Sequence, residues 1–192
     1  MEVKGKKIGF VFTGSFCTFS KTIPKMKELI KLGADITPIM SYNSYELDTK
    51  FGKAKDFIKE IEEICKKQII HTIQEAEPIG PKHLTDIVIV APASGNTMSK
   101  LACDIIDTPA TMAVKSHLRN NLPVVIAPST NNGLGANLVS IGKLINRKNY
   151  YFVPFKQDNP ITKPRSIVFD SSYIIKTIES ALDGEQIEPI LI

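Results

Sequence analysis

The residues best suited to chemistry are those of a short polar loop that follows an apolar run. The run at residues 8–12 leads into Thr13, Gly14 and Ser15, where Gly14 lets a ligand approach the backbone and Ser15 adds a hydroxyl donor. Backbone N–H groups at the junction of a loop and a helix attract anions, so the loop predicts a phosphate site. It holds one glycine instead of G-x-G-x-x-G, and the Walker pattern is absent, so we expect a ligand smaller than a dinucleotide.

Three further loops share this composition of hydroxyl groups, amides and glycine. They are SYNS at 41–44, PASGNTMSK at 92–100 and PSTNNGLG at 128–135. Each follows a predicted strand, and the carboxyl ends of parallel strands meet at one edge of a sheet, where ligands bind. Loops that only connect elements could have a similar composition, but four of them at one edge favour a ligand site.

The end of the second predicted strand indicates which kind of nucleotide binds. Dinucleotide folds place an Asp or Glu there to hold a ribose, whereas this strand ends in Ser41, a phosphate donor. Glu46 and Asp48 lie further along the chain. The pattern predicts a mononucleotide held by its phosphate; the alternative is that Ser41 and Asn43 only form a turn.

The loop PASGNTMSK adds groups that suit the polar edge of a heterocycle. We expect Pro92 to end the strand, residues 94–96 to form a turn and Thr97 to cap the next helix. Asn96 both donates and accepts hydrogen bonds. Lys100 lies one turn into the helix and reaches either an anion or solvent.

The elements that would position these loops alternate along the chain. Strands are predicted at 7–12, 35–41, 86–91, 123–127 and 150–153, and helices at 20–32, 53–67, 97–103, 109–119, 136–145 and 171–182. Ser20 is expected to cap the first helix, and Pro38 argues against a central position for the second strand. Residues 154–164, punctuated by prolines, are expected to form a loop.

This order predicts an α/β fold, with a doubly wound, Rossmann-like or flavodoxin-like, mostly parallel sheet and helices on both faces. The 192 residues are 43% hydrophobic, which suits one domain over residues 1–192 with a C-terminal helix. The apolar tail EQIEPILI is expected to pack on the body or on a neighbouring subunit.

Composition excludes several classes of protein. The net charge is +4, and acidic residues interrupt the lysines of 50–67, so we expect neither nucleic acid nor a membrane as a partner. The three cysteines lack metal-binding spacing, so we expect no metal site, no disulfide framework and a reducing, cytoplasmic location without a signal peptide.

Cys17 could have a redox or covalent-flavin role near a helix start, but we expect a small buried loop residue. Surface or structural roles are expected for His71, His83 and His117.

The Gly14-Ser15 pair, Ser41 and the stretch PASGNT-x-x-K-x-A resemble the flavoprotein family of cysteine decarboxylases and flavin prenyltransferases. The resemblance implies a doubly wound fold, an FMN cofactor, and homotrimers with the flavin at subunit contacts. The residues that it implies for the cofactor are Gly14, Ser15, Phe16, Ser41, Asn43, Pro92, Ala93, Ser94, Asn96, Thr97, Lys100 and Thr108.

Departures from the family concern its chemistry. Neither His71 nor His83 matches the catalytic histidine of the decarboxylases, and Pro78 stands near its position. In the substrate motif P-x-M-N-x-x-M-W, this chain keeps Pro128 and Asn131 but replaces both methionines and the tryptophan. Flavin binding is therefore expected to be kept and cysteine decarboxylation lost. The catalytic residues stay unassigned, with Asn96, Asn131 and Lys100 as candidates.

Stretches from KGKKIGFVFTGSFCTF to the terminal PIL carry a closer resemblance, to one component of a two-component oxidoreductase of spore formation. It implies oxidation of a small dicarboxylate in the mother cell, with NAD or NADP on the partner protein.

No G-x-G-x-x-G follows a predicted strand, so we expect no nicotinamide site here and no activity without that partner. The residues 131–133 and Lys100 are candidates to orient the dicarboxylate; Arg119 is a further cation that the sequence does not place. The alternatives are an independent flavin-dependent decarboxylase or prenyltransferase, and a non-catalytic, substrate-binding protein that keeps the flavin pocket.

Overall fold

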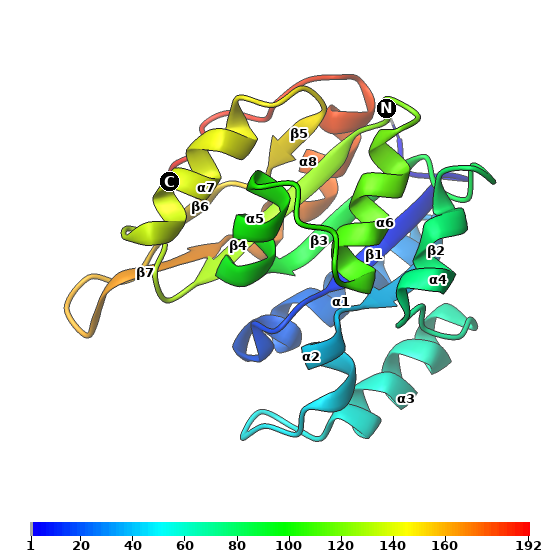
Figure 1. The fold of residues 1–192 in the computed structure, drawn as a ribbon, viewed down its shortest axis with the longest axis horizontal. Coiled ribbons are helices and arrows are strands. Elements are labelled where there is room, and N and C mark those ends of the chain that lie inside the picture. Colours follow the sequence, from blue (N-terminus) through cyan, green and yellow to red (C-terminus); the bar gives the residue numbers. More distant parts are fainter. Residues whose placement is uncertain (1) are drawn as a thin grey trace.

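The computed structural model describes residues 2–192, which build a seven-stranded sheet between two layers of helices (Figure 1). The strand order is β2-β1-β3-β4-β7-β6, and β5 pairs with β4. The strands are β1 (Lys7–Phe12), β2 (Asp35–Met40), β3 (Ile87–Ala93), β4 (Val124–Thr130), β5 (Tyr150–Phe152), β6 (Phe155–Asn159) and β7 (Lys163–Phe169).

The first five strands are parallel, and their order β2-β1-β3-β4-β5 is flavodoxin-like. All of β3 and nearly all of β4 are buried, as expected for central strands that carry helices on both faces. The chain reverses its direction of winding between β1 and β3. Ligands of such sheets bind in the crevice at that reversal, beyond the carboxyl ends of the strands.

Helices cover both faces of the sheet. In Figure 1, α5 and α6 lie in front of the strands, and α1 and α8 lie behind them. The helices are α1 (Phe19–Lys31), α2 (Tyr42–Glu46), α3 (Ala54–Cys65), α4 (Ile73–Ala76), α5 (Gly95–Ala102), α6 (Pro109–Leu118), α7 (Ala136–Ile145) and α8 (Ile174–Leu182). The doubly wound fold and the order of the predicted elements are confirmed.

Details at element ends differ from the predictions. Ser20 lies inside α1, which begins at Phe19 after a 3-10 turn, so it does not cap this helix. Pro38 lies in β2, an edge strand of the sheet, as its missing N–H led us to expect. The short helices α2 and α4 were not predicted, because neither is long enough to show an apolar period.

The prediction of a loop at 154–164 is wrong, because β6 and β7 form an antiparallel hairpin there. Pro154 precedes β6 and Pro160 lies in the turn, so these prolines delimit strands. Most of the residues from Lys156 to Arg165 are exposed and polar, which left no apolar alternation to detect.

The apolar tail binds to the body through its backbone. The N–H of Phe155 donates to Ile190 O at 2.9 Å, and the N–H of Ile192 donates to Phe155 O at 3.2 Å. Ile187 is buried, whereas Leu191 is 69% exposed. The tail therefore packs on the body, as predicted, but leaves apolar side chains at the surface.

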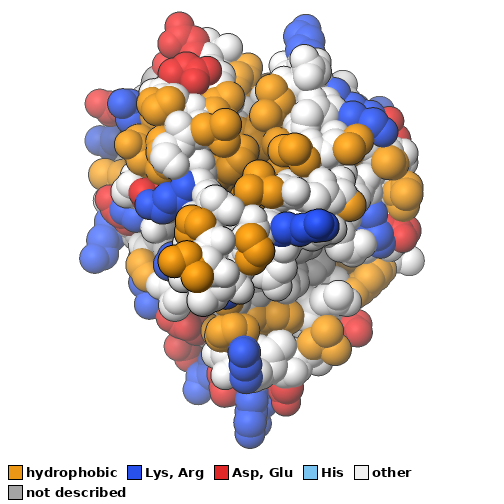
Figure 2. Space-filling view, turned by 90° about the vertical axis from the view of Figure 1, so that its left-hand side faces the viewer, with side chains coloured by type: hydrophobic (Ala, Val, Ile, Leu, Met, Phe, Trp, Pro, Cys, Tyr) orange, Lys and Arg blue, Asp and Glu red, His pale blue; other side chains and the backbone are white. Residues whose placement is uncertain are grey.

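The outer side of α7 also exposes apolar side chains. Leu138 and Val139 are 51% and 64% exposed, and Leu134 and Ile145 flank them. Figure 2 shows hydrophobic side chains gathered on the side of the molecule that carries α7. We call these four residues the α7 patch.

Candidate functional site

A pocket of about 370 Å³ opens at the carboxyl edge of the sheet, where the winding reverses. Residues that follow β1, β2 and β3 share its wall, as the loop composition predicted. The lining residues are Gly14, Ser41, Tyr42, Asn43, Ser94, Asn96, Thr97, Lys100, Asp107 and Thr108.

Thr13 holds the loop after β1 against the end of β3. Its buried hydroxyl donates to Pro92 O at 2.6 Å and accepts from the N–H of Ser94 at 2.9 Å. These bonds bring Gly14 and Ser94 to the same pocket. Gly14 has space, because an added Cβ would lie 3.8 Å from its closest neighbour, the Cβ of Asn43.

The hydroxyl of Ser15 has a different partner from the one predicted. It donates to Ser129 O at 2.6 Å, which fixes the loop to β4, and Ser15 lines a neighbouring pocket. A hydroxyl has one hydrogen to donate, so this one is not free for a phosphate. The sequence could not reveal this, because Ser15 and Ser129 are far apart along the chain.

Ser41 lies at the wall of the pocket and caps α2. Its Oγ accepts from the N–H of Ser44 at 3.4 Å and lies 3.0 Å from the Ser44 hydroxyl, which donates to Phe12 O. The side chain is nearly buried, at 7% exposure. Asn43 is exposed beside it, so a polar ligand meets both groups.

Ser94, not Thr97, caps α5. Its Oγ accepts from the N–H of Thr97 at 3.3 Å. Because β3 extends to Ala93, both Pro92 and Ala93 are fully buried in the strand and do not line the pocket. The first turn of α5 leaves N–H groups without intrahelical acceptors, and the positive end of its dipole faces the same space.

A buried polar network supports the start of α5. The amide of Asn137 donates to Gly95 O at 3.3 Å and to Ser99 Oγ at 3.1 Å, and its Oδ1 accepts from Thr130 at 2.8 Å. This network ties α7 to α5, which bears Asn96 and Thr97. Sequence reasoning missed Asn137, since a lone asparagine in an apolar helix gives no signal of its partners.

Charge at the pocket is balanced. Lys100 is half-buried, and its ammonium contacts both carboxylate oxygens of Asp107 at 2.8 and 2.9 Å. Thr108 forms a capping box with Thr111 at the start of α6. Asp107 and Tyr42 were not predicted as pocket residues. With its cation paired, the pocket would bind an anion mainly through hydroxyl, amide and backbone N–H groups.

A second pocket of about 330 Å³ adjoins the first and shares Gly14 with it. Asn131 lies here, as predicted for this edge, and its Oδ1 accepts from Ser166 at 3.4 Å. Two lysines, Lys21 and Lys163, bring positive charge, although Lys163 is paired with Asp158 at 2.8 Å. Other residues of its wall include Ser15, Phe16, Cys17, Phe51, Ser129 and Thr130.

The remaining candidate residues have the following places. Cys17 is exposed, so the expectation of a buried loop residue is wrong. His83 is exposed, and His71 is stacked on Tyr45 with ring centroids 4.0 Å apart. Arg119 lies at the opposite edge of the sheet, at the end of α6, and takes no part in this site.

The 370 Å³ pocket offers hydrogen-bond donors of the kind that would bind FMN. The Asn43 amide and the backbone N–H groups at the start of α5 offer neutral donors for a phosphate, and the hydroxyls of Ser41, Ser94 and Thr97 lie beside them. Asn96 is exposed at the rim, where an amide suits the polar edge of a flavin ring.

The chain belongs to the Flavoprotein family, whose profile matches residues 1–166. More specifically, it is 43% identical over 191 residues to the B subunit of dipicolinate synthase from Bacillus subtilis, covering all of this chain and 96% of that protein. The crystal structure of the same B subunit from Bacillus halodurans superposes with a TM-score of 0.91 at 43% identity, covering 100% of this chain and 98% of the other.

A more distant structure shares the fold alone. The FMN-dependent cysteine decarboxylase SpaF superposes with a TM-score of 0.65 at 18% identity, covering 93% of this chain and 98% of that one. The family resemblance read from the sequence is thus confirmed over the full chain. Within residues 2–192, no helix combines the length and the apolar character needed to cross a bilayer.

Proposed function

We propose that this protein is the B subunit of a dipicolinate synthase, which oxidises dihydrodipicolinate to dipicolinate together with a nicotinamide-binding A subunit. The observation that carries the proposal is the 43% identity to the Bacillus subtilis protein over 191 residues. The likeness to a cysteine decarboxylase, at 18% identity, extends to the fold alone. The replaced methionines and tryptophan after β4 also argue against that reaction.

FMN is the cofactor that the 370 Å³ pocket would hold. Ser41, Asn43 and the start of α5 would bind its phosphate, and Asn96 and Thr97 would lie beside the ring. When bound, a flavin supplies reversible electron transfer. The chain's own contribution is to hold that ring next to the second pocket, since Gly14 lies in both walls.

The second pocket is the place proposed for the small dicarboxylate. Lys21 and Lys163 would attract its carboxylates, and the Asn131 amide would orient one of them. NAD or NADP would be bound by the A subunit, which must then dock at this edge of the sheet. The complex would work in the cytoplasm of a sporulating mother cell.

The test is to assay dipicolinate formation by its ultraviolet absorbance with each of the two proteins alone and with the two mixed, with and without FMN. We expect activity from the mixture and none from this chain alone. Full activity from the nicotinamide-binding partner alone would refute an essential role for this chain. Activity of this chain alone with a nicotinamide would refute the division of labour.

Substitutions at Ser41 separate cofactor binding from folding. Asp is as good a helix cap as Ser, so Ser41→Asp keeps the cap of α2 but sets a negative charge beside the phosphate. We expect it to abolish FMN binding in a protein that still unfolds cooperatively, although burial of the new carboxylate lowers the unfolding temperature. Ser41→Ala should weaken FMN affinity about tenfold or more, because a hydrogen bond to a charged group contributes roughly 1.5–3 kcal/mol. Wild-type FMN affinity in Ser41→Asp would show that the phosphate lies elsewhere.

A further inference from the structure

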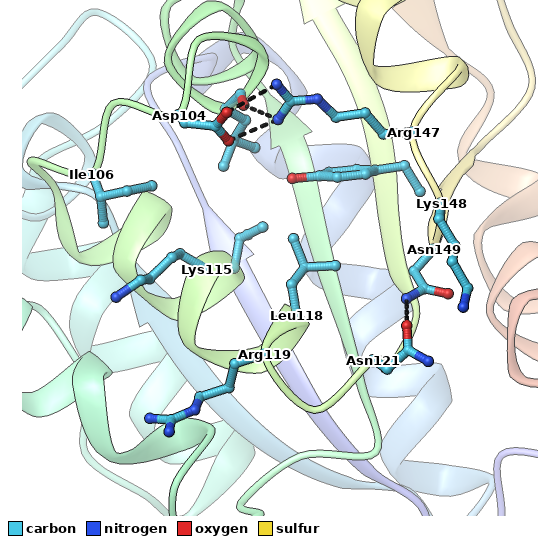
Figure 3. Close-up of a pocket in the computed structure, with 12 residues that line it drawn as sticks. Asp104, Ile106, Lys115, Leu118, Arg119, Asn121, Arg147, Lys148 and Asn149 are labelled. Carbon is cyan, nitrogen blue, oxygen red and sulfur yellow. Dashed lines mark hydrogen bonds and ion pairs between the residues drawn. The ribbon is translucent and has the colours of Figure 1, made fainter.

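A third pocket, of about 580 Å³, lies at the opposite edge of the sheet from the flavin pocket. It is bounded by the ends of α5 and α6, by the loops that precede β4 and β5, and by Tyr150, the first residue of β5 (Figure 3). The proposed function makes no use of it. Its volume is within the range of small-molecule sites, about 300–1,000 Å³.

The floor of this pocket is apolar. Leu101 and Val114 are buried, Ile106 and Leu118 are half-buried, and Tyr150 is 8% exposed. Burial raises the pKa of the Tyr150 hydroxyl to about 12, so the ring stays neutral at physiological pH. Such a surface favours a flat, aromatic group over a small, fully hydrated ion.

Four cations and one carboxylate surround the floor. Arg147 is fully engaged: it forms a bidentate pair with Asp104 and donates to Leu101 O and Ala102 O. In contrast, Lys115, Arg119 and Lys148 are exposed and form no ion pair among residues 2–192. Figure 3 shows Lys115 and Arg119 on one side of the pocket and Lys148 on the other.

The two helix ends reduce this positive charge without cancelling it. The C-terminal end of a helix carries roughly half a negative charge, so α5 and α6 together contribute about one. Arg147 already neutralises Asp104 and binds two carbonyls at the end of α5. Three unpaired cations therefore exceed the remaining negative charge, and the pocket attracts anions.

A pair of asparagines adds a directional group. The amide of Asn149 donates to Asn121 Oδ1 at 2.8 Å, which leaves Asn149 Oδ1 and the Asn121 NH₂ hydrogens free for a ligand. An adjacent donor and acceptor match the edge of a heterocyclic base. Both residues have left-handed backbones, with φ of 61° and 68°, which fixes their positions.

From these features we infer that the pocket binds a nucleoside phosphate, with the base on the apolar floor against Asn121 and Asn149, beside Lys148, and the phosphate on the opposite side, facing Lys115 and Arg119. Neither the flavin site nor the dicarboxylate site supplies any of these residues. The site would let a nucleotide bind to this protein at a distance from its chemistry.

Calorimetric titration of the FMN-saturated protein with AMP and ADP tests the inference, since added FMN occupies the other nucleotide pocket. We expect saturable 1:1 binding that weakens when KCl is raised from about 50 to 300 mM. The variant Lys115→Gln/Arg119→Gln/Lys148→Gln should lose at least tenfold in affinity. The control Lys31→Gln/Lys55→Gln/Lys59→Gln removes three exposed cations elsewhere and should bind as the wild type does.

A second variant tests the base. Asn121→Gly/Asn149→Gly removes both amides, and glycine adopts the left-handed backbone without strain. We expect it to lose affinity for AMP while its unfolding temperature changes little. Unchanged AMP affinity in either pocket variant, an equal loss in the lysine control, or tighter binding of pyridine-2,6-dicarboxylate than of AMP would overturn the inference. None of these results depends on dipicolinate synthase activity.

Discussion

At the start of α5, Gly95 is packed too tightly for any side chain. A Cβ there would lie 2.1 Å from Asn137 Oδ1 and 2.6 Å from Thr130 Oγ1, inside the buried network that supports the pocket. Neither group moves freely, because each holds the other by a hydrogen bond. The same loop carries Ser94 and Asn96, so strain at Gly95 is transmitted to the flavin pocket.

We therefore expect Gly95→Ala to lower the free energy of unfolding by about 1–3 kcal/mol and to weaken FMN binding. The matched control is Gly142→Ala in α7, where an added Cβ has no neighbour within 4 Å. That change should raise stability by about 0.5–1 kcal/mol, because alanine is the better helix former. Urea unfolding measures both effects, and a stabilising Gly95→Ala would contradict the packing described here.

Residue types in the loops predicted which residues come together better than they predicted the partner of each side chain. Eight of the twelve proposed cofactor residues line one pocket, because they follow neighbouring parallel strands. The other four, Ser15, Phe16, Pro92 and Ala93, lie outside that pocket, and three of them, Ser15, Pro92 and Ala93, do so for a common reason. Their orientation depends on partners from other strands or on the exact end of β3, and neither can be read from local composition.

At the scale of elements, a buried histidine joins the end of α6 to the strands. The Nε2–H of His117 donates to Pro123 O at 3.0 Å, since that carbonyl only accepts, and Nδ1 accepts from the Thr85 hydroxyl at 2.8 Å. Burial lowers the pKa of His117 to about 4, although Pro123 and Asp86 oppose this shift. The ring is therefore neutral in the folded protein at pH 7.

The lowered pKa of His117 predicts that the free energy of unfolding falls as the solution is acidified from pH 7 to pH 5. Between an unfolded pKa of about 6.5 and the folded value, the unfolded chain binds the extra proton, so acid favours unfolding. The full effect is on the order of 3 kcal/mol. In urea unfolding across this range, the free energy of unfolding of the wild type should fall with pH. The variant His117→Gln should lose this slope, whereas the control His83→Asn, at an exposed site, should keep it. An equal slope in His117→Gln would assign it to other groups.

The elements were predictable where an apolar period was long and unbroken. The strands β1 and β3 and the helices α3 and α7 follow such periods, and their predicted bounds lie close to those observed. The β6–β7 hairpin escaped prediction because it projects from the sheet with polar side chains on most positions. Its pairing with β4 at Ser129 and Thr130 depends on distant contacts and not on local sequence.

At the scale of the whole molecule, the α7 patch is the surface that most needs covering. Exposed leucine, valine and isoleucine side chains on one helix are unusual for a protein that stays monomeric. The family resemblance predicts homotrimers or multiples of them. A closed, symmetric assembly would bury such a patch on every copy without forming fibres.

We expect light scattering to report a trimer or a multiple of it at micromolar concentration. Leu138→Glu/Val139→Lys should shift the protein to monomers, because it places charges in the α7 patch without changing net charge. The control Lys55→Glu/Glu63→Lys alters exposed charges on α3 and should keep the assembly. A wild-type monomer, or an unchanged assembly in the α7 variant, would contradict this prediction.

Short backbone pairings cover part of the two edge strands β2 and β6. Along β2, the N–H of Met40 donates to Ile70 O and the N–H of Ile70 donates to Pro38 O, while the C-terminal tail occupies Phe155 at the start of β6. An open strand margin is a template on which other chains polymerise into amyloid. The C-terminal residues thus cover the start of β6, so a second chain could add a strand there only by displacing them.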